Sequence, residues 1–256
     1  MAPLIEVKKV TNRFGSQVVH DRVSLTLEEN EILGLVGGSG SGKSVLLRTM
    51  LGLNKPANGE VIVNGTNLYD LSAEELLATQ KKWGVLFQNG ALFSGLSVLD
   101  NVALPLREHT SLAPQDIEDL AFMKLQMVGL DPGAANKYPS ALSGGMITRA
   151  AVARAMALDP NILFLDEPTG ALDAVSAEGL DTLMQSMQDI LRLSVIIITH
   201  DLNTLTAVCD RVAVIADKKV EIGSLEDVMQ SSSPKVREYF SNQRMKAALS
   251  QRRKRK

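Results

Sequence analysis

Hydrophobic and polar side chains alternate over residues 4–10 and 18–27, the pattern of strands with one buried face. Residues 31–36 form a short apolar run, which is typical of a strand buried on both faces. Residues 59–65 alternate again between turn signals, and Asn64-Gly65 favours a tight hairpin turn. The N-terminal part is therefore predicted to hold an antiparallel sheet and one central strand.

Helical periodicity dominates the middle of the chain. It predicts a helix over residues 45–52 and further helices within residues 97–158, one opening at Pro114 and another at Gly144. Two β-branched apolar runs, residues 161–165 and 194–199, are typical of central strands in a parallel sheet. Helical segments separate these strands, so we expect an α/β core with a helical lobe inserted at about residues 90–160.

Composition and charge narrow the class of protein. A chain of 256 residues, 45% hydrophobic and 22% charged with a net charge of -2, is typical of a globular protein, not of a nucleic-acid binder. Residues 244–256 hold seven basic and no acidic residues, so the rest carries 20 basic against 29 acidic, a net charge of -9. We expect one domain over residues 4–240 and a basic tail over residues 241–256.

The tail allows two interpretations. It is either a solvated end, or a helix over residues 235–249 that docks on a partner chain while the basic end meets an acidic surface or anionic lipid. No apolar run approaches the roughly 18 to 20 residues that cross a bilayer, and the first 12 residues lack the apolar stretch of a secretory signal. A single cysteine, Cys209, excludes an intrachain disulfide and fits a reducing compartment.

A glycine-rich turn between the strand 31–36 and the helix 45–52 carries the clearest chemical signal. Its glycines let successive backbone N–H groups face the phosphates of a nucleotide, and the following helix directs its N-terminal dipole at the same anion. Lys43 adds a point charge, and the Ser44 hydroxyl can ligate Mg²⁺. The alternative is a flexible turn, which the position between strand and helix disfavours. The loop comprises Gly37, Gly38, Ser39, Gly40, Ser41, Gly42, Lys43 and Ser44.

A pair of carboxylates follows the strand at residues 161–165. Asp166 stands at the carboxyl end of that strand, where Mg²⁺ is expected beside the phosphates, and Glu167 can polarise an attacking water as a general base. Taken alone, the pair could be an acidic helix cap ahead of Pro168. Together with the phosphate loop, it indicates phosphoryl transfer.

Leu142-Ser143-Gly144-Gly145-Met146, at the start of a lobe helix, resembles the signature of the ATP-binding-cassette (ABC) family, with methionine in place of the usual glutamine. Ser143, Gly144 and Gly145 would form an anion site at a helix N-terminus, although a simple helix cap is the alternative. The resemblance spans residues 4 to about 230. It implies a P-loop NTPase (RecA-like) core, an antiparallel β subdomain, an inserted helical lobe, and a homodimer in which the signature meets ATP held by the other protomer.

Further family elements occur in the expected order. By resemblance, Gln88 is the lid glutamine that touches Mg²⁺ and water, Asp173 lies in the loop that crosses the dimer interface, and His200 is the switch histidine at the γ-phosphate. Phe14 stands where an aromatic ring stacks on adenine, although a core phenylalanine is the alternative. The cofactors implied are ATP and Mg²⁺. His20 and His109 fall in predicted turn or lobe-surface positions and receive no role.

Residues 89–102 contain an apolar patch expected to face a membrane subunit. With the signature, they resemble the cassettes that work with mammalian-cell-entry (MCE) lipid-binding proteins, above all those of the maintenance-of-lipid-asymmetry (Mla) phospholipid transporters of Gram-negative bacteria. This implies a peripheral ATPase on the cytoplasmic side of the inner membrane. The implied partners are a permease dimer, an MCE lipid-binding protein and a small STAS-domain regulator, with no nucleic acid.

Three alternatives remain open for the function. The cassettes of amino-acid importers and of lipoprotein-release exporters share all the catalytic motifs and differ chiefly in the patch after Gln88. A soluble cassette of translation or DNA repair would have no membrane partner, but such proteins usually carry two cassettes or a long coiled-coil insertion, and this sequence has neither. The chains that copurify would separate these classes.

Overall fold

The computed structural model describes residues 2–240, which form two compact units. The first unit comprises residues 2–78 and 194–240, and the second comprises residues 79–193. The basic tail at 241–256, and the part of the predicted helix 235–249 beyond Phe240, lie outside the described residues.

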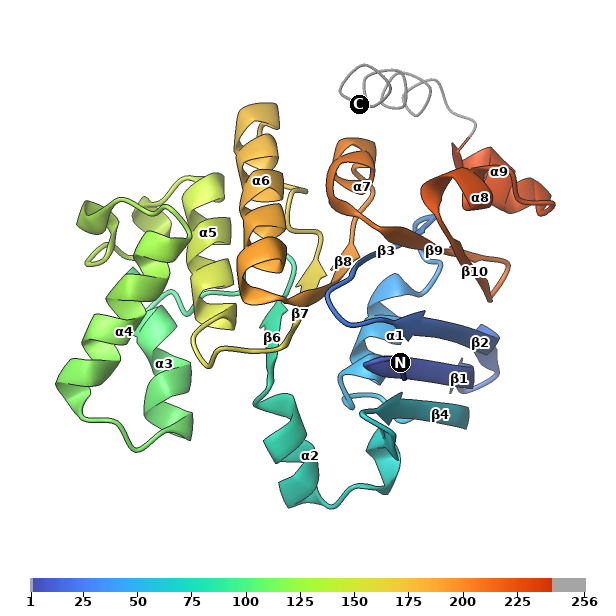
Figure 1. Ribbon diagram of the computed structural model, residues 1–256, viewed down its shortest axis with the longest axis horizontal. Coiled ribbons are helices and arrows are strands. Elements are labelled where there is room, and N and C mark those ends of the chain that lie inside the picture. The colour runs from blue at the N-terminus through green and yellow to red at the C-terminus, as the bar shows by residue number, and fades with distance from the viewer. Residues whose placement is uncertain (1, 241–256) are drawn as a thin grey trace. The chain divides into compact units, whose positions relative to one another are not determined.

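An antiparallel sheet forms one layer of the first unit. Its strand order is β2-β1-β4-β5, and β1, β2 and β4 run side by side next to α1 in Figure 1. Asn64 and Gly65 both have positive φ, 48° and 82°, as the predicted hairpin turn requires. The strands are β1 (Ile5–Phe14), β2 (Gln17–Leu27), β4 (Asn58–Val63) and β5 (Thr66–Asn67).

The first unit also contains strands of a second sheet, in the order β10-β9-β3-β8. β3 pairs in parallel with both β8 and β9, and every residue of β3 and β8 is buried, which explains why Ser194 is the one polar side chain in these two strands. The strands are β3 (Ile32–Gly37), β8 (Ser194–Ile198), β9 (Arg211–Ala216) and β10 (Lys219–Gly223). The helices are α1 (Lys43–Met50), α7 (Leu202–Val208), α8 (Leu225–Met229) and α9 (Pro234–Phe240).

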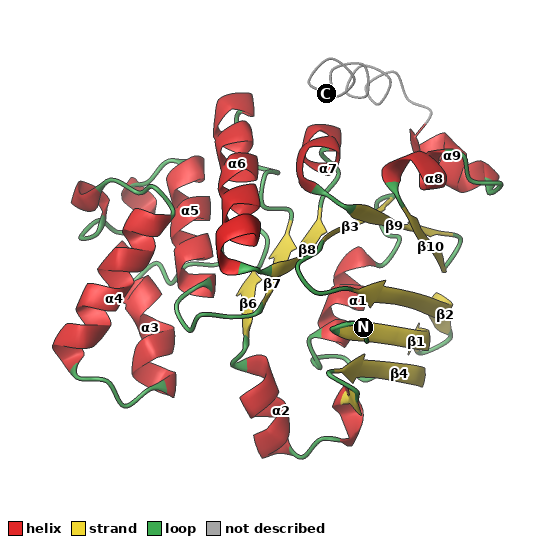
Figure 2. Cartoon of the chain, in the orientation of Figure 1, coloured by secondary structure: helices red, strands yellow, loops and turns green. Residues whose placement is uncertain are grey.

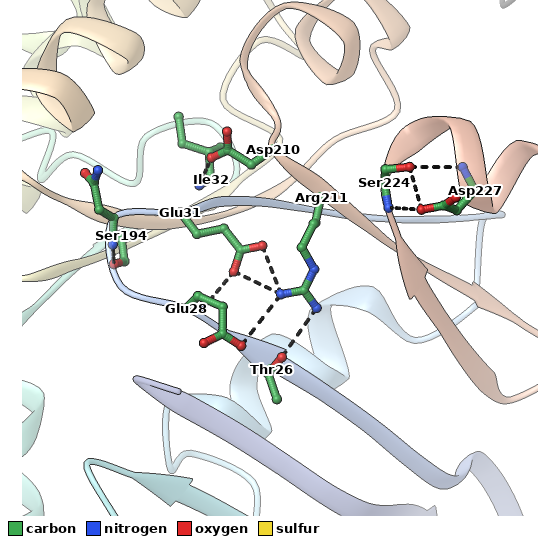
Figure 3. A network of polar contacts seen from close by, with 10 residues as sticks. Thr26, Glu28, Glu31, Ile32, Ser194, Asp210, Arg211, Ser224 and Asp227 are labelled. Atoms are coloured by element: carbon green, nitrogen blue, oxygen red, sulfur yellow. Dashed lines mark hydrogen bonds and ion pairs between the residues drawn. The ribbon is translucent and has the colours of Figure 1, made fainter. Parts of the chain in front are cut away.

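Polar contacts fix the chain where it enters β3 (Figure 3). The Arg211 guanidinium lies 3.2 Å from the Glu31 carboxylate and bonds the hydroxyl of Thr26 at 3.4 Å. Burial raises the pKa of Glu31, although the Glu28 N–H donates to its carboxylate at 2.7 Å and Arg211 lies beside it. The Ile32 N–H donates to the Asp210 carboxylate at 2.8 Å. These contacts set the position of β3 and so of the glycine-rich turn that follows it.

The second unit contains two parallel strands and a set of helices. α3, α4 and α5 pack against one another, and α6 lies beside α5 (Figure 2). The rings of Trp83 and Phe164, one from each strand, meet edge to face with centroids 5.6 Å apart. The elements are β6 (Trp83–Leu86), β7 (Ile162–Asp166), α3 (Val98–His109), α4 (Pro114–Met127), α5 (Gly144–Ala155) and α6 (Ala174–Leu191), while α2 (Ala73–Gln80) crosses the border with the first unit.

The predicted elements agree with the observed ones to within a few residues. The helices expected at Pro114 and Gly144 are α4 and α5, and the predicted mixed α/β fold is confirmed. The second unit extends beyond residues 90–160, because β6, β7 and α6 group with the three lobe helices. Among residues 2–240, no helix combines the length and apolar character that a membrane span needs.

The predicted turn or surface position of His20 is wrong, because His20 lies in β2 with its side chain fully buried. The cause is an irregularity in strand pairing. Val23, Leu25 and Leu27 point inward in regular alternation, but Arg22 has φ 55° and the register shifts between the pairs Val10–Val23 and Asn12–His20. A β-bulge of this kind reverses the alternation, so His20 points inward where regular alternation would have turned Asp21 inward.

Candidate functional site

The glycine-rich turn connects the end of β3 to the start of α1. The Lys43 ammonium donates to the carbonyl oxygens of Gly37 at 2.8 Å and Gly38 at 3.2 Å, so the turn closes around the cation. The Ser41 N–H donates to the Gly38 carbonyl at 3.1 Å. The Ser41 hydroxyl is buried without a hydrogen-bond partner among residues 2–240. A cation enclosed by a turn ahead of a helix N-terminus suits an anionic ligand such as phosphate.

Gly42 occupies a position in this turn where only glycine fits. Its φ is 100°, and a Cβ added there would lie 2.5 Å from Nε2 of His20 and 2.6 Å from Cγ1 of Val19. Side chains of β2 therefore form the floor of the phosphate loop.

His20 is the buried end of a chain of hydrogen bonds that runs beneath this loop. The Thr49 hydroxyl donates to the Val45 carbonyl at 2.9 Å and accepts from the Asn12 amide at 2.9 Å. The Asn12 oxygen therefore faces Nδ1 of His20 at 3.0 Å, which makes Nδ1 the donor. Burial lowers the pKa of His20 to about 4, against a smaller opposing effect of the Ser41 backbone. The floor of the phosphate loop is thus neutral at physiological pH.

Two other predicted site residues lie in the first unit. Phe14, at the end of β1, is 52% exposed, so the core alternative is wrong and its ring is available for stacking. His200 is exposed between β8 and α7, at the carboxyl end of a parallel strand. The next residue, Asp201, caps α7 by accepting from the Asn203 N–H at 2.9 Å.

The carboxylate pair lies in the second unit. Asp166 is the last residue of β7 and is buried, and Glu167 follows with φ 53°. A glutamate in this left-handed conformation is strained, and such strain gathers at functional positions. The Gly170 N–H donates to the Glu167 carbonyl at 3.2 Å and closes the turn.

The signature residues begin α5. The Ser143 hydroxyl accepts from the Met146 N–H at 3.3 Å, so it caps this helix. A Cβ added to Gly144 would lie 3.2 Å from the Ala171 carbonyl, and one added to Gly145 would lie 3.3 Å from the Ser176 hydroxyl. The signature thus packs against the turn that leads from Glu167 into α6.

Asp173, in that turn, is the N-cap of α6. Its carboxylate accepts from the N–H groups of Ser176 at 2.9 Å and Val175 at 3.0 Å, and from the Ser176 hydroxyl at 2.8 Å. The bond from the Ser176 N–H is the main reason that the pKa of Asp173 lies below its usual value. The carboxylate therefore stays charged at neutral pH.

Gln88 is exposed and lies two residues after the end of β6. The three residues after it have positive φ, and Arg154 of α5 donates to the carbonyls of Gly90 and Ala91, both at 2.8 Å. Phe93, within the predicted apolar patch, is 55% exposed. Arg154 was missed from the sequence because its partners are backbone groups more than 60 positions away, which leaves no local signal.

The site residues are therefore divided between the two units. The phosphate loop, Phe14 and His200 belong to the first unit, whereas Gln88, the carboxylate pair, the signature and Asp173 belong to the second. A glycine-rich turn between a parallel strand and a helix, with an aspartate-glutamate pair after another parallel strand, defines the chain as a P-loop nucleoside triphosphatase.

Comparison with known proteins gives the family. Residues 20–170 match the family described as ABC transporter. The "Intermembrane phospholipid transport system ATP-binding protein MlaF" of Haemophilus influenzae is 40% identical over 94% of this chain and 91% of its own length. The "Probable ribonucleotide transport ATP-binding protein mkl" of Mycobacterium leprae is 39% identical over 96% of this chain and 71% of its own length. The chain therefore belongs to the ABC transporter family, as an ATPase.

Solved structures agree with this assignment. The ATP-binding cassette MJ0796, solved as a dimer in a post-hydrolysis state bound to ADP and Pi, has a TM-score of 0.79 and 32% identity over 86% of this chain and 98% of its own. The protein cbiO1 of Clostridium perfringens, part of the ABC transporter complex cbiONQ, has a TM-score of 0.81 and 25% identity over 98% of this chain and 100% of its own.

Proposed function

We propose that this ATPase powers the movement of phospholipid between the inner and outer membranes of a Gram-negative bacterium. The observation that carries the proposal is the 40% identity to the intermembrane phospholipid transport protein of Haemophilus influenzae, which extends over 94% of this chain and 91% of the relative. In an ABC transporter the cassette hydrolyses ATP, whereas the membrane partners determine which substrate is moved. Similarity over 94% of the chain, which extends well beyond the catalytic motifs, is therefore the informative feature.

The phosphate loop is suited to the nucleotide. Lys43 would exchange its bonds to the carbonyls of Gly37 and Gly38 for bonds to phosphate oxygens, and the unpartnered hydroxyl of Ser41 supplies a further donor. The exposed ring of Phe14 would stack on adenine. The loop from Gly37 to Ser44 thus binds the triphosphate of ATP. Because the His20 ring beneath the loop is neutral, the positive charge that this loop offers the phosphates is that of Lys43.

Three oxygen donors suit a magnesium ion. Ser44, Gln88 and Asp166 would supply a hydroxyl, an amide oxygen and a carboxylate, which are the hard ligands that Mg²⁺ prefers. Among residues 2–240, no cluster of three or more His, Cys, Asp or Glu side chains could hold a metal by itself. A site with one carboxylate fits Mg²⁺, which is usually bound by few protein ligands together with substrate phosphates. When bound, the ion would neutralise charge that develops on the phosphates.

Hydrolysis would be carried out by the carboxylate next to the magnesium ligand. Glu167 would accept a proton from the attacking water, and His200 would contact the γ-phosphate and orient that water. Ser143, Gly144 and Gly145 would bind the γ-phosphate of ATP held by a second copy of this chain, and Asp173 would lie at the interface between the copies. The cap bonds of Ser143 and Asp173 keep both side chains fixed at helix N-termini.

The partners follow from the transport role. The homodimer would sit under an integral-membrane permease dimer on the cytoplasmic side of the inner membrane, with an MCE lipid-binding protein and a small STAS-domain regulator in the same complex. The exposed side chain of Phe93 supports a contact surface on the second unit.

The test is purification of the full-length chain with its membrane partners, followed by analysis of the bound small molecules. The tagged chain is extracted in mild detergent, copurifying chains are identified, and the complex is reconstituted in vesicles that contain fluorescent phospholipid. We expect a permease and an MCE protein, bound phospholipid, and ATP-dependent lipid transfer that Glu167→Gln abolishes.

Two outcomes would contradict the proposal. One is copurification with the permease of an amino-acid importer or of a lipoprotein-release exporter. The other is ATPase stimulation by ribonucleotide substrates in place of phospholipid, the result expected if the mycobacterial relatives named for ribonucleotide transport share this chain's cargo. Dialysed complex without added lipid serves as the control for basal hydrolysis.

A further inference from the structure

The three residues after Gln88 adopt left-handed backbone conformations in succession. φ is 61° at Asn89, 76° at Gly90 and 46° at Ala91. Glycine adopts this region readily and asparagine tolerates it, but alanine is strained there because its Cβ crowds the following carbonyl oxygen. Residues 89–91, here called the lid turn, therefore need contacts from elsewhere to hold them in place.

Arg154 supplies those contacts from α5. One nitrogen of its guanidinium donates to the Gly90 carbonyl and another to the Ala91 carbonyl, both at 2.8 Å. The planar fork thus holds two successive carbonyls at once, which the single ammonium of a lysine cannot do in the same geometry. Burial lowers the pKa of this guanidinium, so the two bonds are made by a partly desolvated group.

Side chains on the same face of α5 also pack against the lid turn. A Cβ added to Gly90 would lie 3.0 Å from Cγ2 of Ile147 and 3.2 Å from Cβ of Ala151. Residues 147, 151 and 154 are spaced four and three apart, so they share one side of the helix. The lid turn is therefore seated on this side, with Gly90 as the point of closest approach.

The helix that holds the lid turn is also the helix that begins at the signature. Ser143 caps α5 at its first turn, and Arg154 stands near its end. On the other side of the turn, the Gly90 N–H donates to the Phe87 carbonyl at 2.9 Å, which encloses Gln88 within the same tight turn. The backbone of Gln88 is thus tied to the signature helix through residues 90 and 91.

We infer that Arg154 is a positioning residue, which locks the lid turn to the signature helix so that Gln88 and Ser143 move as one body. This inference rests on the proposed role of Gln88 at the magnesium ion and the attacking water. Arg154 itself touches neither nucleotide nor metal in this scheme.

The test is Arg154→Lys in the full-length chain, measured as ATPase rate against ATP and against Mg²⁺. The matched control is Arg149→Lys, since Arg149 also lies on α5 and donates to a backbone carbonyl, that of Val128 at 2.5 Å. We expect Arg154→Lys to lower kcat about tenfold or more and to raise the Mg²⁺ concentration for half-maximal rate, with KM for ATP changed less than about twofold. Arg149→Lys should leave all three within about twofold.

A second substitution that restores activity would distinguish a positioning role of Arg154 from a general effect on stability. Ala91→Asn places in the lid turn a residue that tolerates positive φ, so the turn needs less restraint. In the double variant Arg154→Lys, Ala91→Asn, we expect at least about a threefold recovery of kcat. Ala91→Asn alone should resemble the wild-type chain, because Ala91 is exposed and its carbonyl, not its side chain, accepts the bond.

Either of two results would overturn the inference. Arg154→Lys could match Arg149→Lys in kcat and Mg²⁺ dependence, or its loss of rate could follow a loss of thermal stability without rescue by Ala91→Asn. The variant Gln88→Ala keeps the two proposals apart. If Gln88→Ala hydrolyses ATP at the wild-type rate, the role proposed for Gln88 fails. If it is slow while Arg154→Lys is not, only the positioning role of Arg154 fails.

Discussion

Glu167 combines a strained backbone with a place directly after the buried Asp166. In the proposed mechanism it accepts the proton of the attacking water, which its amide counterpart cannot do. Glu167→Gln should therefore slow hydrolysis by about 10²-fold or more and leave ATP affinity nearly unchanged. Single-turnover hydrolysis and equilibrium nucleotide binding measure the two effects separately. A fall of less than about fivefold would assign the base to another residue, and Lys43→Ala, which should weaken binding itself, is the contrasting variant.

His20 makes the stability of the chain depend on pH. Its folded pKa of about 4 lies below the ordinary value of 6.5, so between these two values the unfolded chain binds more protons than the folded one. The stabilisation is therefore complete above about pH 7 and is lost as pH falls toward 4. From pH 7 to pH 5 the free energy of unfolding should drop by roughly 2 kcal/mol through this residue.

Denaturant unfolding at the two pH values tests this expectation. His20→Asn keeps a donor toward Asn12 but cannot be protonated, so it should lose most of the drop. His109→Asn, at an exposed position near the end of α3, is the matched control and should keep the drop. Equal pH dependence of all three chains would mean that the pKa of His20 does not change on folding.

The positions of Lys43, Asp166 and Ser143 in the fold were predictable because each stands at the junction of a strand or helix with a distinctive turn. Their roles at the nucleotide stay predictions. The surface position predicted for His20 is wrong because a bulge at Arg22 reverses the alternation of β2. No residue type in this segment signals the bulge. Arg154 carries no motif, since it binds main-chain oxygens that any sequence would present.

At the scale of elements, a buried asparagine organises the segment that leads into α3. Asn101 accepts from the Phe93 N–H at 2.8 Å and donates to the carbonyls of Phe93 at 3.1 Å and Ser97 at 2.9 Å. These bonds hold the segment while the Phe93 side chain remains exposed. Phe93, the exposed part of the apolar patch predicted after Gln88, is therefore presented by a loop that these hydrogen bonds hold in place.

Asn101→Ala should loosen this loop without dismantling the unit. Removing the amide leaves the Phe93 N–H without its partner, although the Phe93 carbonyl keeps its bond from the Leu96 N–H, and the lost bond costs about 1 to 3 kcal/mol. Hydrogen exchange should quicken at residues 93–97, while α6 keeps its protection. Gln115→Ala, which removes an exposed side-chain bond to Asp119 in α4, is the control and should leave residues 93–97 unchanged. Unaltered exchange at residues 93–97 in Asn101→Ala would show that the loop is held by packing alone.

The elements themselves were largely predictable. β3, β7 and β8 are buried at every residue, and apart from Asp166 at the end of β7 and Ser194 at the start of β8 they carry no polar side chain, which is typical of strands covered on both faces. The borders of the second unit were not predictable, because β6, β7 and α6 group with the lobe helices through contacts that no periodicity encodes.

At the scale of the whole molecule, the proposed site is shared by two copies of the chain. If the signature of one copy completes the phosphate loop of the other, a dimer of one Ser143→Arg chain and one Lys43→Ala chain contains one intact site and one doubly defective site. Such mixed dimers should bind about one ATP each and hydrolyse it at up to about half the wild-type rate if the sites act independently. Differently tagged chains, purified through both tags, supply the sample.

Each homodimer is the control, and both should be inactive. Mixed dimers that hydrolyse ATP no faster than either homodimer would argue against a shared site.

The bulge at Arg22 also decides which side chain of β2 lies under Gly42. If Arg22 were extended and β2 continued without the bulge, regular alternation would turn Asp21 inward in place of His20. Asp21 would lose its 2.6 Å ion pair with Lys219, and a carboxylate would stand below Gly42 where a neutral ring now lies. A single left-handed residue in a strand thus decides whether the proposed triphosphate site has a neutral floor or a negatively charged one.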